Sequence, residues 1–285
     1  MYSKDSPNEK TGFSFEIFPP KKEAPIDTIY KTLEDLKNLS PDFISVTYSA
    51  GGSQNSAATV QIASDIQEKY KIPSMSHLAC IQLSKEDAKD ILNRLRENKV
   101  QRILALRGDL SPNMTPKTDF RHASDLVSFI KSQGDFTVAG ACYPEGHSEC
   151  DSLEQDIENL KRKVDAGTDF LVSQLFFQND FFYSFVDKAR NAGIYVPIEA
   201  GIMPVTNKKQ IERMVTMCGA SLPKKFVTIM NRYENNPEAL REAGIAYAID
   251  QIVDLFAHGV DGVHLYTMNN AYVATKISQA VEALR

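Results

Sequence analysis

The feature that most constrains the fold of this chain is a regular alternation of short apolar segments with amphipathic ones. The apolar segments are rich in β-branched and aromatic residues and are bounded by Gly, Pro, Asp or Ser, which is typical of buried β-strands. Up to the seventh segment, their starts lie about 30 residues apart. We expect strands at residues 13–18, 42–49, 75–80, 102–108, 137–143, 169–177, 196–203 and 260–267.

The segments between these strands have the residue spacing of helices. Apolar residues in 26–39 and in 86–97 recur at intervals of three and four, which places them on one helical stripe. Residues 152–166 begin acidic and end basic, as the helix dipole prefers. The longer interval 204–259 contains further helical patterns, and Pro237 stands at the first turn of one of them. The sequence therefore predicts extra helical material between strands 7 and 8.

Eight strands, each followed by a helix, are what a (β/α)8 TIM barrel requires. The competing fold is a doubly wound open sheet, which usually has a glycine-rich turn after its first strand. Here the first strand is followed by PPKKEAP, with no GxGxxG pattern. No Pro-, Ser- or Gly-rich linker divides the 285 residues. We therefore predict a single α/β catalytic barrel domain over 1–285, with residues 1–11 as a flexible N-terminal lead.

Composition and charge argue against several classes of partner. The chain has 32 Lys and Arg against 37 Asp and Glu, a net charge of −5, which argues against a nucleic-acid or anionic-membrane footprint. Its first residues lack the apolar core of a signal peptide, and its longest apolar runs are about six residues, far below a membrane span. We expect a cytoplasmic protein without nucleic-acid or membrane partners.

Cysteine and histidine spacing favours neither a disulfide scaffold nor a metal centre. The four cysteines show no CxxC or Cys–His ligand spacing, so reduced thiols are expected. Cys80 and Cys142 are interpreted as small apolar residues. The five histidines form neither HxH nor HExxH, and no GxSxG elbow is present. No metal site and no serine or cysteine nucleophile is predicted.

In such barrels, catalytic groups lie at the carboxyl ends of the strands and in the loops that follow. Polar side chains occupy these positions along most of the chain, so we expect a polar ring around one mouth. Its predicted members are Glu16, Thr47, Tyr48, His77, Arg107, Asp109, Tyr143, His147, Gln174 and Tyr266.

Glu16 is the most informative of these residues. Strand alternation places it on the same side as Ser14 and Phe18, opposite Phe15 and Ile17. A carboxylate on a barrel strand is either a structural group paired with a cation or a catalytic acid or base. Both interpretations stay open on this argument alone.

Three short motifs also have two interpretations each. LRGD (106–109) is either a salt bridge ending a strand or a loop that grips a heteroaromatic ligand, with Gly108 allowing close backbone approach. YPEGH (143–147) is either a simple turn or a stacking ring next to a histidine. LKRK (160–163) is most simply a charge cluster at the end of a helix.

Taken together, these segments resemble the catalytic barrel of the methylenetetrahydrofolate reductase family, in its short, single-domain prokaryotic form. The resemblance extends from about residue 12 to 280. Any one of its motifs is weak, but they occur in the family's order. They are SFEIFPPK, FISVTYSAGG, HLAC, LALRGD, HASDLV, YPEGH, NLKRKVDAGTDFLVSQLFF, GIMPV and HLYTMN.

The resemblance implies a flavoenzyme that binds FAD and works by ping-pong hydride transfer. NADH or NADPH would reduce the flavin, and 5,10-methylenetetrahydrofolate would then be reduced to 5-methyltetrahydrofolate. Glu16 would be the general acid that helps to open the five-membered ring of the folate. Asp109 would lie near the pyrimidine edge of the flavin, where it tunes the flavin potential and also meets the pterin.

The resemblance assigns two sets of contacts to numbered positions of this chain. Gln174 would serve both pterin and nicotinamide, Gln210 would contact folate, and we place Asp109 and Tyr266 with them as substrate-binding residues. The flavin contacts would be Thr47, Tyr48, Ala50, His77, Arg107, Gly108, Asp109, Ala123, Tyr143, His147, Asp156, Asn159, Arg162 and Lys163.

One position departs from the family pattern. Asn270 stands where the family often has Arg, a residue that would pair with the glutamate carboxylate of the folate. Weaker folate affinity, or substitution by Lys208 or Lys209, is our hypothesis.

Other functions stay open at this point. A proline-dehydrogenase-like flavin barrel, a flavin subunit reduced by an electron-transfer partner, and a folate-binding protein without catalysis are the alternatives. The reductant is undecided between NADH, NADPH and a protein donor, and we expect a homo-oligomer.

Overall fold

The computed structural model describes residues 11–20, 26–48, 53–109 and 117–285, with the side chains of 53–56, 210 and 217 outside that description. Within these ranges the strands form a closed parallel barrel in the order β1 to β8. This confirms the (β/α)8 prediction over the open doubly wound sheet. The strands are β1 (Gly12–Ile17), β2 (Ile44–Val46), β3 (Ser74–Ala79), β4 (Arg102–Leu106), β5 (Thr137–Cys142), β6 (Phe170–Ser173), β7 (Ile198–Ile202) and β8 (Gly262–Tyr266).

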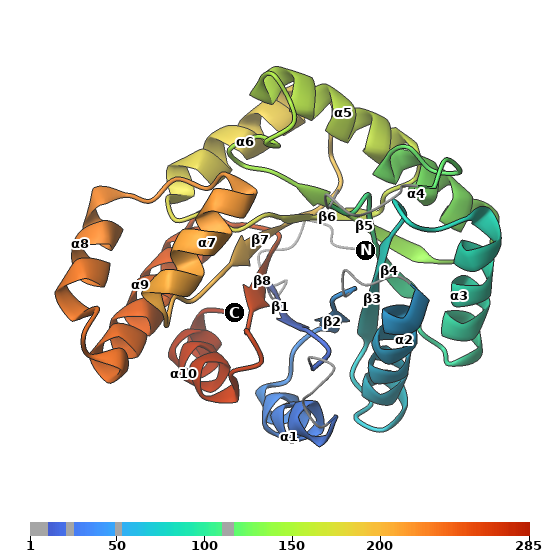
Figure 1. Ribbon diagram of the computed structural model, residues 1–285. Coiled ribbons are helices and arrows are strands. Elements are labelled where there is room, and N and C mark those ends of the chain that lie inside the picture. Colours follow the sequence, from blue (N-terminus) through green and yellow to red (C-terminus); the bar gives the residue numbers. More distant parts are fainter. Residues whose placement is uncertain (1–10, 21–25, 49–52, 110–116) are drawn as a thin grey trace. The chain divides into compact units, whose positions relative to one another are not determined.

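Helices follow the strands along the chain, and the interval between β7 and β8 holds α7, α8 and α9, as predicted (Figure 1). Pro237 is the first residue of α9, the position expected for it. The helices are α1 (Asp27–Leu36), α2 (Ser53–Glu68), α3 (Lys85–Glu97), α4 (Ala123–Ser132), α5 (Leu153–Asp165), α6 (Asn179–Asn191), α7 (Lys208–Cys218), α8 (Lys224–Tyr233), α9 (Pro237–Ala257) and α10 (Ala271–Val281). Short 3-10 helices η1 (Lys37–Leu39) and η2 (Glu282–Leu284) follow α1 and α10.

Backbone contacts divide the chain into two compact units. Unit 1 contains Met1–Phe13, Cys142–Lys161 and Val172–Arg285, and unit 2 contains Ser14–Ala141 and Arg162–Leu171. Unit 2 therefore holds β2, β3 and β4, whereas unit 1 holds β7 and β8. A single domain over 1–285 stays a prediction.

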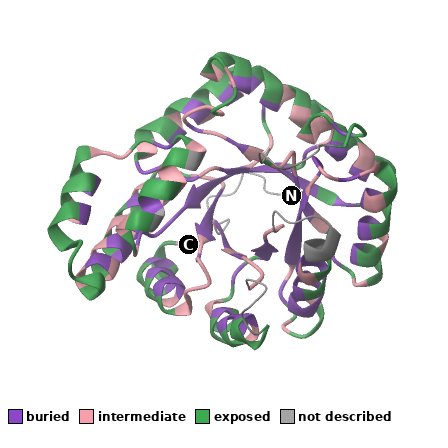
Figure 2. Ribbon diagram, in the orientation of Figure 1, coloured by how far each residue is buried: buried purple, intermediate pink, exposed green. Residues whose placement is uncertain are grey.

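Burial follows the amphipathic patterns of the sequence. Figure 2 shows strands that are largely buried and helices that are exposed along one side only. In α3, the stripe predicted from the sequence is the buried face, formed by Ala88, Ile91, Leu92 and Leu95. The helix begins with a capping box between Ser84 and Asp87, which satisfies backbone donors of its first turn.

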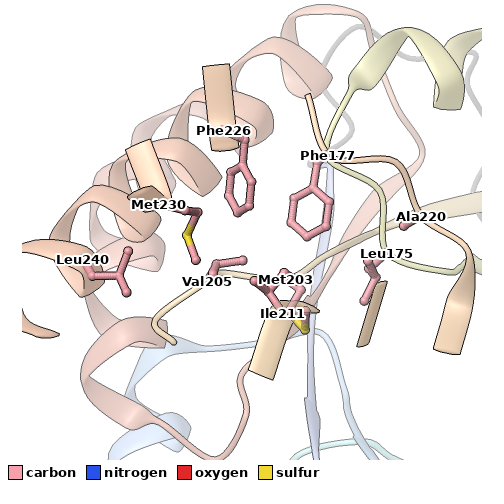
Figure 3. Close-up of a cluster of buried hydrophobic side chains, with 9 residues drawn as sticks. All are labelled: Leu175, Phe177, Met203, Val205, Ile211, Ala220, Phe226, Met230 and Leu240. Atoms are coloured by element: carbon pink, nitrogen blue, oxygen red, sulfur yellow. The ribbon is translucent and has the colours of Figure 1, made fainter. Parts of the chain in front are cut away.

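Strand β6 is much shorter than the predicted segment 169–177, because it ends at Ser173. Leu175 and Phe177 then leave the sheet and join a buried apolar cluster of unit 1 (Figure 3). Its other members are Met203, Val205, Ile211, Ala220, Phe226, Met230 and Leu240. The Phe177 and Phe226 rings stack with centroids 4.7 Å apart. Segment 169–177 is apolar to its end because its last residues pack in this cluster. An apolar pattern alone does not show whether a residue is buried in the sheet or in such a cluster.

The described residues contain free thiols and neither a membrane-spanning helix nor a cluster of metal-ligating side chains. Cys80 and Cys142 are buried, all four thiols are free, and burial raises the pKa of Cys80 to about 11. No helix in the described ranges has the length and apolarity needed to cross a membrane. Across those same ranges, no three His, Cys, Asp or Glu side chains gather as metal ligands would.

Candidate active site

In unit 2, strand pairing brings Glu16 next to His77. Glu16 pairs with Ser45, and Ser45 pairs with Met75, so all three side chains point to one side of the sheet. His77 lies two residues beyond Met75 on β3 and points the same way. Its Nε2 atom lies 3.5 Å from Glu16 Oε2. The imidazole is almost fully buried, whereas the Glu16 side chain is 18% exposed.

Two further predicted residues lie where β2 ends. Thr47 and Tyr48 are half-buried and follow Val46 directly. The Thr47 carbonyl accepts a hydrogen bond from Thr59 Oγ1 of α2 at 3.0 Å. The Thr47 amide donates to the Ile17 carbonyl at 3.0 Å. This end of β2 is thus tied on both sides. Ala50 lies outside the described residues.

Arg107 and Gly108 form the turn after β4. The Arg107 Nε atom donates to the Gly108 carbonyl at 3.1 Å. Gly108 has φ +90°, and a Cβ atom there would lie 3.2 Å from Ala79 Cβ and 3.1 Å from Ile81 Cγ2. The turn thus needs glycine both for its backbone conformation and for its close packing. Asp109 follows in an exposed position, and Ala123 is the first residue of α4.

Lys163 is held against β5 inside unit 2. Its side chain passes over Gly140, where a Cβ atom would lie only 3.0 Å from Lys163 Cδ. Its Nζ atom donates to the Ala141 carbonyl at 2.6 Å. Arg162, the preceding residue, is exposed. LKRK therefore contains one cation directed toward the end of a strand and another on the surface, which is more than a helix-end charge cluster.

In unit 1, Tyr143 and His147 are neighbours. Their rings meet edge to face with centroids 4.6 Å apart. The Glu149 amide donates to His147 Nδ1 at 3.1 Å, so in the neutral imidazole the proton resides on Nε2. Gly146, with φ +87°, closes the turn by donating to the Tyr143 carbonyl at 3.0 Å.

Asp156 holds the loop that carries His147. This buried carboxylate on α5 accepts from the His147 amide at 3.1 Å and from Cys150 Sγ at 3.7 Å. Asn159 Nδ2 lies 3.6 Å from the same sulfur. Burial, and then the Asp156 charge, raise the pKa of Cys150. Asp156 and Asn159, predicted to contact flavin, therefore also fix the loop after β5.

Gln174 and Tyr266 both lie at strand ends in unit 1. A small pocket is lined by Tyr143, Gln174 and Leu175 together with Cys218 and Ala220, so two predicted residues share one cavity. The Tyr266 hydroxyl donates to the Ser173 carbonyl at 2.6 Å. Gln210 lies on α7, but its side chain is outside the described residues.

The two residues proposed to replace the missing arginine differ in their surroundings. Lys208 pairs with Glu234 and donates to Asn231 of α8 at 2.9 Å. Lys209 is exposed. Asn270 itself is the N-cap of α10, and its side-chain oxygen accepts from the Val273 amide at 3.2 Å. Lys208 thus links α7 to α8, and Asn270 caps the first turn of α10.

Sequence reasoning missed a set of buried polar residues on β7 and β8. Glu199 and His264 are 2% and 0% exposed, and their Oε2 and Nδ1 atoms lie 3.8 Å apart. Gly201 lies between Tyr266 and Ser173. Alternation along 198–202 and 260–267 indicates which residues share a face with Glu199 and with His264, but neither of these two stands at the carboxyl end of its strand.

The model of the family described as methylenetetrahydrofolate reductase matches residues 2–282. The chain belongs to the methylenetetrahydrofolate reductase family. It is therefore an oxidoreductase of that family, as the sequence motifs predicted.

Two relatives of the methylenetetrahydrofolate reductase family illustrate the match. A 5,10-methylenetetrahydrofolate reductase from Pectobacterium carotovorum is 37% identical over 264 residues, covering 93% of this chain and 88% of that protein. Methylenetetrahydrofolate reductase (NADH) 1 from Arabidopsis thaliana is 37% identical over 278 residues, covering 91% of this chain and 46% of that protein. The chain thus spans about half the length of the plant relative.

A solved structure shares the fold. An uncharacterized protein from Clostridium thermocellum, which binds two copies of 5-methyl-5,6,7,8-tetrahydrofolic acid, has a TM-score of 0.66 and 14% sequence identity. The similarity covers 97% of this chain and 96% of that one. At this identity the likeness establishes the barrel fold alone.

Proposed function

We propose that this protein reduces 5,10-methylenetetrahydrofolate to 5-methyltetrahydrofolate, with FAD as its cofactor and NADH as the electron donor. The observation that carries the proposal is the family match over residues 2–282, with a carboxyl group, Glu16, held beside His77 at the expected strand position. The name of the plant relative specifies NADH, which favours it over NADPH or a protein donor.

The chemistry of the predicted flavin residues fits an anionic, heteroaromatic cofactor. Arg107, Arg162 and Lys163 supply cations suited to a pyrophosphate, and the Tyr143 and His147 rings are suited to aromatic contact. Gly108, with φ +90°, lets backbone approach a ligand without a side chain between them. We propose as FAD contacts Thr47, Tyr48, Ala50, His77, Arg107, Gly108, Asp109, Ala123, Tyr143, His147, Asp156, Asn159, Arg162 and Lys163.

Bound FAD would supply hydride transfer, a reaction that amino-acid side chains do not perform. Glu16 would give its proton to the ring nitrogen of the folate that departs when the five-membered ring opens. The methylene carbon, left as an iminium on the other nitrogen, then accepts the hydride and becomes a methyl group. His77, 3.5 Å away, would orient the Glu16 carboxyl during this transfer.

The remaining assignments concern the substrate. Asp109 is exposed after β4, and we propose that it meets both the flavin edge and the pterin. Gln174, in the pocket with Tyr143, would bind the pterin and, in the other half-reaction, the nicotinamide. Gln210 of α7 and Tyr266 of β8 complete the proposed folate contacts.

The test is anaerobic mixing of the FAD-loaded protein with NADH, followed by methylenetetrahydrofolate, while the flavin absorbance is recorded. We expect bleaching by NADH and recovery with the folate. Glu16→Gln should keep the first step and slow the second by about 10²–10⁴-fold, the usual contribution of a general acid. Glu238→Gln on α9, where the side chain is 83% exposed, is the matched control and should change neither step.

Each other outcome contradicts a defined part of the proposal. Bleaching by NADPH alone, or only by a reduced protein donor, would exclude NADH as the reductant. Bleaching by proline would support the proline-dehydrogenase alternative. A protein that cannot be loaded with FAD is not a flavoenzyme.

A further inference from the structure

Strands β7 and β8 combine two glycines with three large polar side chains on one side of the sheet. Glu199 pairs with Gly262, and Gly201 pairs with His264, so these four residues point the same way. Tyr266, two residues after His264, shares that side. Each glycine lies beside a long side chain: Glu199 Cγ would be 3.1 Å from a Cβ at Gly262, and Tyr266 Oη 2.6 Å from one at Gly201.

Gly201 allows Tyr266 to reach across a strand. Tyr266 lies on β8 and Ser173 at the end of β6, with β7 between them in the strand order. The Tyr266 hydroxyl nevertheless donates to the Ser173 carbonyl at 2.6 Å. A Cβ atom at Gly201 would lie 2.2 Å from that carbonyl oxygen, closer than any real contact. The absence of a side chain at 201 is therefore a condition for this hydrogen bond.

The Tyr266 ring is fixed on two sides. The His264 ring meets it edge to face, with centroids 5.6 Å apart. The apolar surface of the Tyr266 ring packs against the buried cluster that contains Leu175. Glu199, itself buried, lies 3.8 Å from His264 and gives the imidazole a carboxylate neighbour. A ring held in this way directs its hydroxyl to one place.

The hydrogen bond ends next to Gln174. The Gly201 amide donates to Ser173 Oγ at 2.9 Å, and Ser173 Oγ donates to the Gln174 carbonyl at 3.0 Å. The Gln174 amide donates to the Cys142 carbonyl at 2.7 Å, and its side-chain oxygen accepts from the Leu175 amide at 2.9 Å. The oxygen of the carboxamide is thus in use, and its NH2 group is the end suited to donate to a ligand.

We infer that Tyr266 is a positioning residue for Gln174: its hydroxyl, passing over Gly201, fixes Ser173 and thereby sets where the Gln174 carboxamide meets the folate. This inference rests on the proposed function, because Gln174 is a proposed folate contact. The Tyr266 hydroxyl then holds the end of β6, from which Gln174 meets the substrate, and does not itself touch the substrate.

The test is a double-mutant cycle on folate affinity in the FAD-loaded protein. Tyr266→Phe removes the hydroxyl and keeps the ring, and 5-methyltetrahydrofolate is the probe in a calorimetric titration. We expect Tyr266→Phe to weaken binding about fivefold, the effect of one lost neutral hydrogen bond. In a Gln174→Ala background the same change should alter affinity less than twofold, because the residue through which it acts is gone.

Tyr272→Phe is the matched control. The Tyr272 hydroxyl donates to Glu242 at 3.0 Å on an exposed surface, so its loss should leave folate affinity unchanged. Equal weakening by Tyr266→Phe with Gln174 present and with Gln174→Ala would mean that Tyr266 acts on folate directly. An affinity unaltered by Tyr266→Phe in the chain that keeps Gln174 would mean that the Tyr266 hydroxyl has no role. Either result overturns the inference.

Hydrogen exchange of the ligand-free protein gives a readout independent of activity. Tyr266→Phe should speed exchange of the Gln174 amide relative to the unaltered chain and to Tyr272→Phe, because the end of β6 loses a restraint. Unchanged exchange would overturn the inference. A chain that binds no folate would contradict the proposed function instead, and the exchange comparison would still decide whether Tyr266 holds Gln174.

Discussion

The Glu16 carboxylate lies 3.5 Å from His77 Nε2, although β2 stands between the strands that carry these two residues. The contact exists because paired residues of parallel strands point to one side, and His77 is two residues farther along its strand than the pairing partner of Ser45. A histidine almost completely buried beside a partly exposed glutamate side chain is an arrangement that can hold a proton donor in one orientation.

This contact predicts that His77 and Glu16 act as one unit in folate reduction. His77→Ala should slow the folate half-reaction about tenfold in a chain with Glu16, and add little in a Glu16→Gln chain, because coupled residues are not additive. Single-turnover flavin reoxidation measures both. His258→Ala is the control, since His258 also pairs with a carboxylate, Asp254 at 3.4 Å, but this pair lies at the end of α9. Additive losses would show that His77 and Glu16 act separately.

Gly108→Ala is expected to destabilise the chain more than Gly219→Ala. Both glycines have positive φ, +90° and +75°, so alanine at either position costs about 1–3 kcal/mol in backbone strain. Only Gly108 has neighbours for the new methyl group, at 3.1 and 3.2 Å, whereas nothing lies within 4 Å at Gly219. Urea unfolding should give the larger loss for Gly108→Ala; equal losses would contradict the packing argument.

The Asp87 carboxylate is expected to contribute to the free energy of unfolding, and this contribution should be lost in acid. The hydrogen bond from Lys117, followed by those from Ser84, lowers the pKa of Asp87 from 3.8 to about 2. Because the folded pKa lies below the unfolded one, the contribution is complete above pH 3.8 and is lost as pH falls through about 2.

Asp87→Asn should therefore cost about 1 kcal/mol at pH 7, a value reduced by screening because the side chain is 40% exposed. The difference from the unaltered chain should shrink steadily as pH falls from 4 through about 2, because Asp87 becomes protonated over this range and loses its charge. Denaturant unfolding across this range measures it. A difference independent of pH would exclude the carboxylate as its source.

Asn270→Arg should have two opposed effects. Restoring the arginine of the family pattern is expected to tighten folate binding, because a guanidinium pairs with a carboxylate. The same change removes the N-cap of α10, where the Asn270 oxygen accepts from the Val273 amide at 3.2 Å, at a cost of about 1 kcal/mol. Calorimetry and thermal unfolding measure the two effects. An unchanged dissociation constant would mean that the folate glutamate is held elsewhere.

Lys209→Ala should weaken folate binding more than Lys208→Ala. Lys208 is paired with Glu234, the residue that follows α8, and this hydrogen bond raises the pKa of Lys208. Lys208→Ala should therefore act mainly on the melting temperature. Lys209 is exposed and able to meet a carboxylate. Affinities for folate with and without its glutamate separate the two residues. A greater loss of affinity for Lys208→Ala would reverse this assignment.

The sequence by itself determined the order of the elements and which residues end the strands. Period-two and period-3.6 patterns report local burial, so the stripe in α3, the strands that carry Glu16 and His77, and the strand that Arg107 follows were predictable. The family motifs added roles for these residues, because they occur in a fixed order along the chain.

Only the tertiary structure decided which side chains meet across strands. Register sets Glu16 beside His77 and sends the Tyr266 hydroxyl over Gly201, and register depends on pairing that no local pattern encodes. The same holds for Phe177, an apolar residue that packs in the buried cluster with Leu175 and not in the sheet. Whether a residue is buried limits the residue types that can stand at its position, so burial can be predicted from the sequence. A contact between distant residues is fixed only when the whole chain packs.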